Sequence, residues 1–401
     1  MKLPSEKTGA SSWRTAILSG AVAVILLRVI LGLMMGVTWI ILRPYLSPNL
    51  ILSEFHGLFS NSSLPAEALL SVWLRWDAIH HLNLARLGYL KLSEAESVFY
   101  PLYAGLARLT SVTIGGDYLL AGLIVSTLSA WGAFACLYWL AEHFYQGETA
   151  RWSVVALAIY PTAIFLVAPY TESLFLALTM AAFIAAYKER WLAAGLLGCL
   201  ASLARGPGIF TSAALAWIAW DQWRGMQCKQ RGKIAAMLAG LALPVMGGMA
   251  FLLWRNWVGF APIADITRQY SGLIMVNPVR GLASAIIQWL HVNDLQTTLD
   301  LFSALFFIFM GIVMFANRRW RKVEWLIYMA INLLIFLSKE SFQASSLQSM
   351  ARYVLVLFPV FIVLGDWLRS QSRLTRLICT TISSTIMIVL STLYALWVFI
   401  G

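Results

Sequence analysis

Long apolar runs constrain the fold of this chain more than any other feature of its sequence. A transmembrane helix needs about 20 consecutive apolar residues, and eleven segments approach or exceed that length. The predicted spans are 16–42, 118–141, 153–168, 172–187, 191–205, 207–223, 234–258, 298–316, 323–338, 353–368 and 377–400. Charged residues make up only 12% of the 401 residues, about half the share in a typical soluble domain. The sequence therefore predicts an all-α integral membrane protein with about eleven transmembrane helices.

The net charge of +11 indicates orientation rather than a nucleic-acid partner. Lys and Arg collect in the short cytoplasmic loops of membrane proteins. With the N-terminus inside, most basic residues fall in short inner segments such as 317–322, Arg28 and Arg255 lie within spans, and the others are spread over longer outer segments. The first apolar run is too long for a signal-peptide core, so we expect it to be retained as a span.

In this topology the three longest loops, 43–117, 259–297 and 339–352, face outward. Within the first of them, 98–111 is apolar but short and contains a proline, so we expect it to be a surface helix. Long loops between packed spans tend to carry function. We find no linker or repeat, and therefore expect a single domain over 1–401 whose site lies on the outer, non-cytosolic face.

The first outer loop holds a carboxylate among aromatic and basic residues: Arg75, Trp76, Asp77, His80 and His81. Residues three and four apart share a helical face, so Asp77, His80 and His81 would cluster if this segment is helical. One interpretation is that Asp77 only caps the helix N-terminus. The other is that it acts as a general base and takes a proton from an acceptor hydroxyl. Both remain open at this stage.

A second carboxylate, Glu172, begins a predicted span directly after Pro169-Tyr170-Thr171. An acidic residue is favoured at a helix N-terminus by the helix dipole alone. Alternatively, Glu172 and Tyr170 bind sugar hydroxyls or orient the surroundings of Asp77.

Two arginines lie at outer span boundaries. Arg205 precedes Gly206-Pro207-Gly208, and Arg352 precedes Tyr353 at the start of a span, where a cation opposes the helix dipole. Each arginine either reaches toward lipid headgroups or pairs with a phosphate. Arg28 and Arg255 lie inside spans, where they either mark a pathway or pair within the bundle.

Metal chemistry has little support in the sequence. No Asp-x-Asp or His-Glu-x-x-His motif occurs, and the four cysteines have no metal-ligand spacing. We therefore expect neither a metal ion nor another cofactor.

Several of these segments resemble one known family. Arg75-Trp76-Asp77-x-x-His80, Leu84-Ala85-x-x-Gly88-Tyr89, Phe99-Tyr100-Pro101-Leu102-Tyr103, Ala168 to Phe175, Ala204-Arg205-Gly206 and Ser349 to Tyr353 resemble the PIG-V mannosyltransferases, in the expected order. That family belongs to the GT-C superfamily of integral membrane glycosyltransferases. Ala104, where proline is expected, and the Arg-Gly-Pro-Gly turn depart from the pattern and suit a bacterial homologue.

The resemblance implies a GT-C-like fold and inverting transfer of a sugar, usually mannose, from a polyprenyl- or dolichyl-phosphate donor on the non-cytosolic face. An acid of the first outer loop is the catalytic base in such enzymes, and the matching position here is Asp77. Eukaryotic members add the second mannose of the GPI anchor precursor.

We therefore predict a multi-pass glycosyltransferase of the bacterial cell membrane, or of the endoplasmic reticulum if eukaryotic. Its partners would be the lipid-linked donor, a lipid or glycan acceptor and membrane lipids. Asp77 would be the base, and the predicted substrate-binding residues are Arg75, Trp76, His80, His81, Tyr170, Glu172, Arg205, Arg352 and Tyr353. The alternatives are a lipid or lipid-linked sugar flippase, which would place its polar residues near the midplane, and an inactive scaffold.

Overall fold

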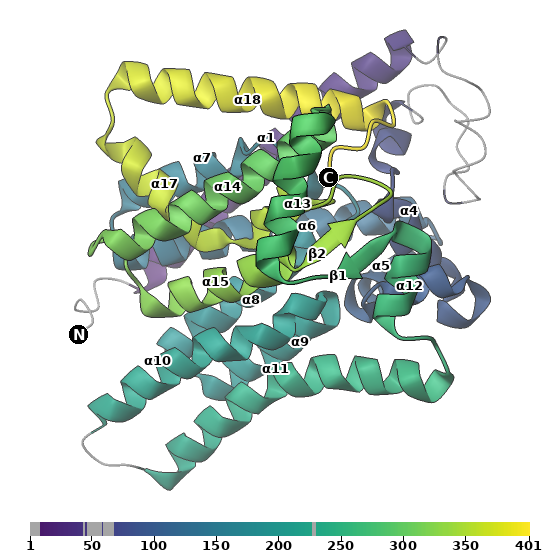
Figure 1. Cartoon of the computed structure of the whole chain (residues 1–401). Coiled ribbons are helices and arrows are strands. Elements are labelled where there is room, and N and C mark those ends of the chain that lie inside the picture. Colours follow the sequence, from purple (N-terminus) through teal and green to yellow (C-terminus); the bar gives the residue numbers. More distant parts are fainter. Residues whose placement is uncertain (1–8, 43–44, 46–57, 59–67, 227–229) are drawn as a thin grey trace.

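The computed structural model describes residues 9–42, 45, 58, 68–226 and 230–401, and these are largely helical (Figure 1). The α-helices are α1 (Gly9–Leu42), α4 (Asp77–Leu87), α5 (Pro101–Thr113), α6 (Tyr118–Phe144), α7 (Gly147–Ala158), α8 (Glu172–Tyr187), α9 (Trp191–Ala204), α10 (Thr211–Gly225), α11 (Arg231–Val258), α12 (Ile263–Ser271), α13 (Pro278–His291), α14 (Leu295–Ala316), α15 (Val323–Leu337), α16 (Met350–Tyr353), α17 (Phe358–Ser370) and α18 (Arg373–Ala395). Two strands, β1 (Leu273–Met275) and β2 (Lys339–Ser341), complete the fold.

Among the described residues, five helices are long and apolar enough to cross a membrane. They comprise Trp13–Leu42, Tyr118–Phe144, Arg231–Val258, Leu295–Ala316 and Arg373–Ala395. A broken pair, Met350–Val356 and Phe358–Ser370, bends by 79° and makes a sixth candidate. Helices α8, α9 and α15 are apolar but shorter. Each predicted span overlaps a helix, and the count of eleven spans stays a prediction.

The outward faces of the long helices are covered with large apolar side chains. On α1 these include Leu18, Ile25 and Leu33, and on α14 they include Phe309 and Ile312, all of which are exposed. Soluble monomers seldom expose contiguous apolar surface on this scale. These faces therefore indicate a lipid environment.

Helices α9 and α11 approach closely because both present small residues at their contact. A Cβ atom added to Gly240 would lie 2.5 Å from the carbonyl oxygen of Trp191, and one added to Gly198 would lie 2.6 Å from Cγ of Pro244. Close backbone approach through small residues is typical of membrane helix pairs. This pair lies with α10 at the bottom of Figure 1.

A two-stranded antiparallel sheet joins two of the predicted outer loops in this largely helical fold. Strand β1 comes from the second predicted outer loop and β2 from the third, with Ile274 opposite Glu340. The Glu340 carboxylate accepts hydrogen bonds from Nε of Arg280 (2.9 Å) and Oγ of Ser284 (3.0 Å), which lie on α13. The two loops are therefore joined into one unit, seen with α4, α5 and α12 on the right of Figure 1.

Polar side chains of the predicted inner segments meet at the other end of the bundle. The Asp366 carboxylate of α17 accepts hydrogen bonds from Arg319 (2.7 Å), Trp320 (3.0 Å) and Thr149 (3.0 Å). Two of the predicted inner segments are thus joined through Asp366.

Candidate active site

Five charged side chains line one cavity of about 540 Å³ beside the small sheet. They come from elements far apart in the sequence, namely the start of α4, the start of α8, the residue after α9, β2 and α16. They are Asp77, Glu172, Arg205, Lys339 and Arg352. Apolar residues of α12 and β1, such as Ile263 and Ile274, form another wall. The cavity therefore offers both charged and apolar surface to a ligand.

Asp77 is the first residue of α4, and the capping interpretation of its side chain is not what the structure shows. The N-cap is Trp76, and no side-chain capping hydrogen bond is present. The φ angle of Trp76 is +52°, a conformation that is strained for a bulky residue. This strained turn directs the chain so that Asp77 lines the cavity. The α4 dipole favours the carboxylate there.

Arg352 joins the two carboxylates of the cavity. Its Nη1 donates to Oδ2 of Asp77 (2.7 Å), and its Nε lies 3.2 Å from Oε1 of Glu172. Oε1 of Glu172 also accepts a hydrogen bond from Nη1 of Arg205 (2.5 Å). The four charges thus alternate along one chain of contacts. Arg352 therefore has two carboxylate partners within the protein, and its contact with an anionic ligand stays a prediction.

The position of Arg352 depends on the broken span. Ser349 adopts a left-handed conformation (φ +66°) and α16 lasts a single turn before the 79° bend. Asp300 accepts a hydrogen bond from the Ala351 amide (3.0 Å), and Oγ1 of Thr162 donates to the Ala351 carbonyl (2.8 Å). Backbone groups freed by the break are thereby satisfied, and Arg352 is held in the cavity wall.

Opposing effects set the protonation of Asp77. Burial raises the pKa of the Asp77 carboxyl, but the charge and hydrogen bond of Arg352, together with His81 and His80, lower it by more, so the pKa lies below its ordinary value. Asp77 is therefore ionised at neutral pH. A carboxylate in that state can accept a proton, as a general base must.

Of the two histidines, the structure brings only His81 to the cavity. Burial lowers the pKa of His81 to about 3, so the ring is neutral. Its Nδ1 is buried and has no hydrogen-bond partner among the described residues. Nδ1 of His80 instead lies 3.3 Å from Oε1 of Glu96, and its ring stacks on Phe99. His80 therefore does not line the cavity, in contrast to the prediction that it would contact substrate.

The two predicted tyrosines lie under the arginines. The Arg352 guanidinium carbon is 5.2 Å from the centres of both the Tyr170 and Tyr353 rings. The Tyr170 hydroxyl donates to the Arg75 carbonyl (3.0 Å), so the ring rather than the hydroxyl is left to face a ligand. Both residues line the cavity.

Arg75 and Trp76 do not line the cavity, which differs from the expectation that they contact substrate. Arg75 is fully buried, and its guanidinium donates to the carbonyls of Ala395 (2.9 and 3.1 Å) and Ser71 (2.6 Å). The Trp76 ring packs edge-on against Trp397. Both residues tie the loop before α4 to the C-terminal segment, and we propose a structural role for them.

Replacing Arg75 with methionine tests that role. We expect the free energy of unfolding to fall by about 3 kcal/mol or more, because several buried carbonyls lose their donor at about 1–3 kcal/mol each. Thermal unfolding of the purified protein in detergent measures the loss. Arg108→Met, at an exposed position of α5, is the control and should unfold like the wild type. Unchanged stability of Arg75→Met together with a raised KM would instead assign Arg75 to the substrate.

The arginines within spans pair inside the bundle. Arg28 donates to the Leu123 (3.2 Å) and Val167 (2.5 Å) carbonyls and to Thr127 (2.6 Å). Arg255 donates to the carbonyl and hydroxyl of Ser97 (2.8 and 3.0 Å). These contacts join separate elements and favour the packing interpretation over a pathway.

Sequence reasoning missed Lys339 and Asp300. Lys339 is the first residue of β2 and lines the cavity, whereas Asp300 is a buried residue of α14 that does not line it. Their positions in the sequence could have indicated them, since Lys339 directly follows the predicted span 323–338 and Asp300 lies at the start of the predicted span 298–316. Among the described residues, no group of three or more His, Cys, Asp or Glu side chains is arranged to hold a metal ion.

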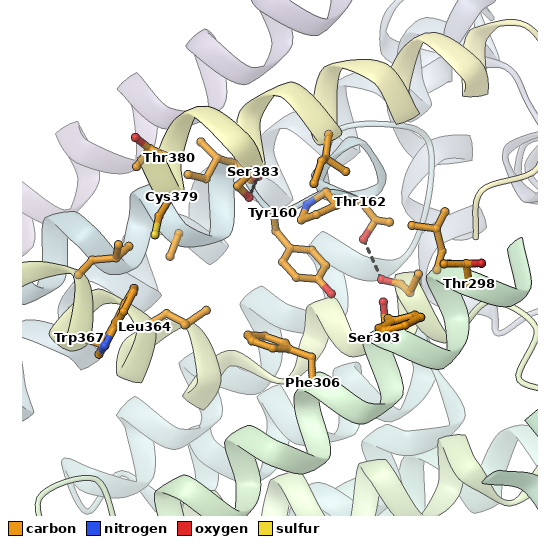
Figure 2. Close-up of a pocket in the computed structure, with 18 residues that line it drawn as sticks. Tyr160, Thr162, Thr298, Ser303, Phe306, Leu364, Trp367, Cys379, Thr380 and Ser383 are labelled. Atoms are coloured by element: carbon orange, nitrogen blue, oxygen red, sulfur yellow. Dashed lines mark hydrogen bonds between the residues drawn. The ribbon is translucent and has the colours of Figure 1, made fainter. Parts of the chain in front are cut away.

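A second cavity of about 390 Å³ lies on the other side of α16 (Figure 2). It is mostly apolar and opens between α14, α17 and α18, with the Tyr160 ring pointing into it and Phe306 and Trp367 on its walls. Ala351 lines this cavity and the neighbouring Arg352 lines the charged one. One helical turn therefore separates the two.

No protein-family model matches the sequence. Among solved structures, an oligosaccharyltransferase from Archaeoglobus fulgidus is similar with a TM-score of 0.43 and 14% identity, over 91% of this chain and 53% of that one. An oligosaccharyltransferase from the same organism, in complex with an inhibitory peptide and a dolichol-phosphate, gives a TM-score of 0.42 and 12% identity, over 93% and 55% of the two chains.

Curated relatives match by sequence over part of the chain. GPI mannosyltransferase 2 of Cryptococcus neoformans is 30% identical over 186 residues, covering 42% of this chain and 43% of that protein. GPI mannosyltransferase 2 of Schizosaccharomyces pombe is 30% identical over 142 residues, covering 34% and 30%. The chain thus spans less than half the length of the curated relatives it matches. Over about two fifths of its length, it is similar in sequence to proteins named GPI mannosyltransferase 2.

Proposed function

We propose that this chain is an inverting glycosyltransferase of the GT-C type that moves mannose from a polyprenyl-phosphate donor to a lipid or glycan acceptor. The observation that carries the proposal is Asp77, an ionised carboxylate held by Arg352 in the wall of a cavity of about 540 Å³. The partial similarity to proteins named GPI mannosyltransferase 2 supports the reaction class and the sugar.

In the proposed reaction, Asp77 takes the proton of the acceptor hydroxyl while that oxygen attacks the anomeric carbon. The bond from the anomeric carbon to the phosphate oxygen breaks, and its electron pair leaves with the polyprenyl phosphate. A single displacement of this kind inverts the anomeric centre. Because Arg352 also contacts Glu172, its charge stays compensated when Asp77 becomes protonated.

Two buried groups of the cavity are available to sugar hydroxyls. Oε2 of Glu172 and Nδ1 of His81 have no hydrogen-bond partner among the described residues, although both are buried. A buried polar group without a partner costs about 1–3 kcal/mol, and ligand hydroxyls would remove that cost. Specificity for a sugar follows from such groups, since an analogue lacking the hydroxyl leaves them unpaired.

The proposal includes the membrane arrangement. About eleven spans would place the end of the bundle with α4, β1 and β2 on the non-cytosolic side, and the opposite end, which is rich in Lys and Arg, in the cytosol. A bacterial cell membrane is the proposed location.

Transfer by the purified full-length protein tests the function. We expect the protein, reconstituted in vesicles with polyprenyl-phosphate-[³H]mannose, to form a labelled mannoside on methyl α-mannoside, with the anomeric configuration opposite to that of the donor. Chromatography of the water-soluble products and NMR of the new linkage measure the result.

Polyprenyl-phosphate-glucose in the same vesicles is the control for the sugar, and transfer of glucose in place of mannose would correct that part of the proposal. Movement of labelled donor between leaflets without cleavage of the sugar–phosphate bond would contradict the enzyme and favour a flippase.

A further inference from the structure

Lys339 differs from the other cations of the cavity because, among the described residues, it forms no ion pair with a carboxylate that lines the cavity. Arg205 contacts Glu172, and Arg352 contacts both Glu172 and Asp77. In the part of the chain that the structure describes, no such ion pair involves Lys339, although its residue exposure is only 8%. The two carboxylates that line the cavity are thus already paired with its two arginines, and Lys339 adds a further basic group to the cavity wall.

The surroundings of Lys339 hold it beside the other cations. Its Nζ donates a hydrogen bond to the Gln348 carbonyl and lies 4.0 Å from the centre of the Tyr353 ring. The Arg205 guanidinium carbon lies 5.0 Å from the centre of the same ring. Tyr353 is therefore a platform that positions Lys339 and Arg205 by cation–π contacts. Lys339, Arg205 and Tyr353 thus lie together in the cavity wall, and among the described residues neither Lys339 nor Arg205 forms an ion pair with Asp77.

This concentration of positive charge opposes the ammonium form of Lys339. Burial lowers the pKa of Lys339, Asp300 raises it, and the charges of Arg352 and Arg205 lower it further. The Asp300 carboxylate already accepts a hydrogen bond from the Ala351 amide, so it does not interact with Lys339 alone. An anionic group of a ligand would favour the ammonium, since an opposite charge within a few ångströms stabilises the charged form.

We propose that Lys339, together with Arg205, binds the phosphate of the lipid-linked substrate and stabilises the charge that develops on it. The inference rests on the proposed function. When the anomeric carbon–oxygen bond breaks, the electron pair stays on the phosphate, whose negative charge rises by one unit. A lysine ammonium in the cavity wall attracts the doubly charged leaving phosphate more strongly than the singly charged bound diester. It therefore assists the departure rather than only binding the donor.

Binding of the leaving product tests this assignment. The purified full-length protein in micelles is titrated with polyprenyl phosphate, with the neutral polyprenol of equal chain length, and with phosphatidylglycerol. We expect Lys339→Met to raise the Kd for polyprenyl phosphate about tenfold to a hundredfold, the usual effect of a lost hydrogen bond to a charged group. The Kd for polyprenol should not change. Lys339→Arg should recover most of the affinity for the phosphate.

Arg280→Met is the matched control, because Arg280 lies near the sheet but outside the cavity and should leave all three Kd values unchanged. If Lys339→Met does not fold, Lys339→Gln, which keeps a donor for Gln348, replaces it. Equal affinity of the variant and the wild type for polyprenyl phosphate would overturn the inference while leaving the proposed function intact. Selective loss of phosphatidylglycerol binding alone would assign Lys339 to a membrane headgroup and overturn it as well. A wild type that binds no polyprenyl lipid would remove the proposed function and the inference together.

Discussion

Replacing Asp77 with asparagine is expected to lower the rate of sugar transfer by about 10²–10⁴-fold, the usual contribution of a positioned general base. Asparagine has nearly the same size and still accepts a hydrogen bond from Arg352, but it cannot take the acceptor proton. The loss should therefore fall mainly on kcat and leave KM for the donor largely unchanged. Initial rates of mannose transfer by reconstituted protein measure it, with thermal unfolding to show that the variant is folded.

Asp117→Asn is the matched control for the same chemical change. Asp117 caps α6 by accepting a hydrogen bond from the Leu120 amide (2.8 Å), a role that asparagine can also fill, and it is exposed. This variant should transfer sugar at the wild-type rate. Full activity of Asp77→Asn would show that the base lies elsewhere, and Glu172 would then be the first residue to test.

The charge pattern of the sequence predicts that the main site residues lie together at one end of the bundle. Glu172 and Arg205 flank predicted span boundaries that the topology assigned to one side, and the structure has them in contact at 2.5 Å. Span boundaries and loop charges are properties of the chain that need no knowledge of tertiary contacts. The pairing of Arg352 with Asp77 was not predictable, because it depends on the bend after α16 and on the strained Trp76.

The directions of the side chains on α4 could not be predicted from the sequence either. His80 and His81 are adjacent, so they point about 100° apart around the helix. The prediction that both histidines face the substrate did not take account of Glu96 and Phe99. These two residues contact His80 and hold its ring outside the cavity lining. Arg75 illustrates the same limit, since its buried carbonyl partners on Ala395 lie 320 residues further along the chain. The pairing of β1 with β2 likewise joins two predicted loops that are distant in sequence.

Replacing Arg352 with glutamine is expected to reduce transfer by about a hundredfold at neutral pH, similar to the removal of one electrostatic stabiliser from an active site. It should also change the pH dependence. Burial raises the pKa of Asp77 and the Arg352 charge is the largest of the effects that lower it, so removal of that charge makes the pKa rise. At a given acidic pH, less Asp77 is then ionised. The acid limb of the rate profile should therefore move to higher pH, and the defect of the variant should be larger at pH 5.5 than at pH 8.

The comparison with Arg205→Gln separates this effect from a general loss of charge. Arg205 contacts Glu172 but not Asp77, so its removal should lower the rate without moving the acid limb as far. Removal of one member of a buried pair can destabilise a protein by about 3–5 kcal/mol, so Arg352→Lys, which keeps the charge, is measured beside it and should hold the acid limb near its wild-type position. If Arg352→Gln shows the same defect at every pH, Arg352 does not act through the charge of Asp77. Its contribution would then be to position the carboxylates through its two-sided contact.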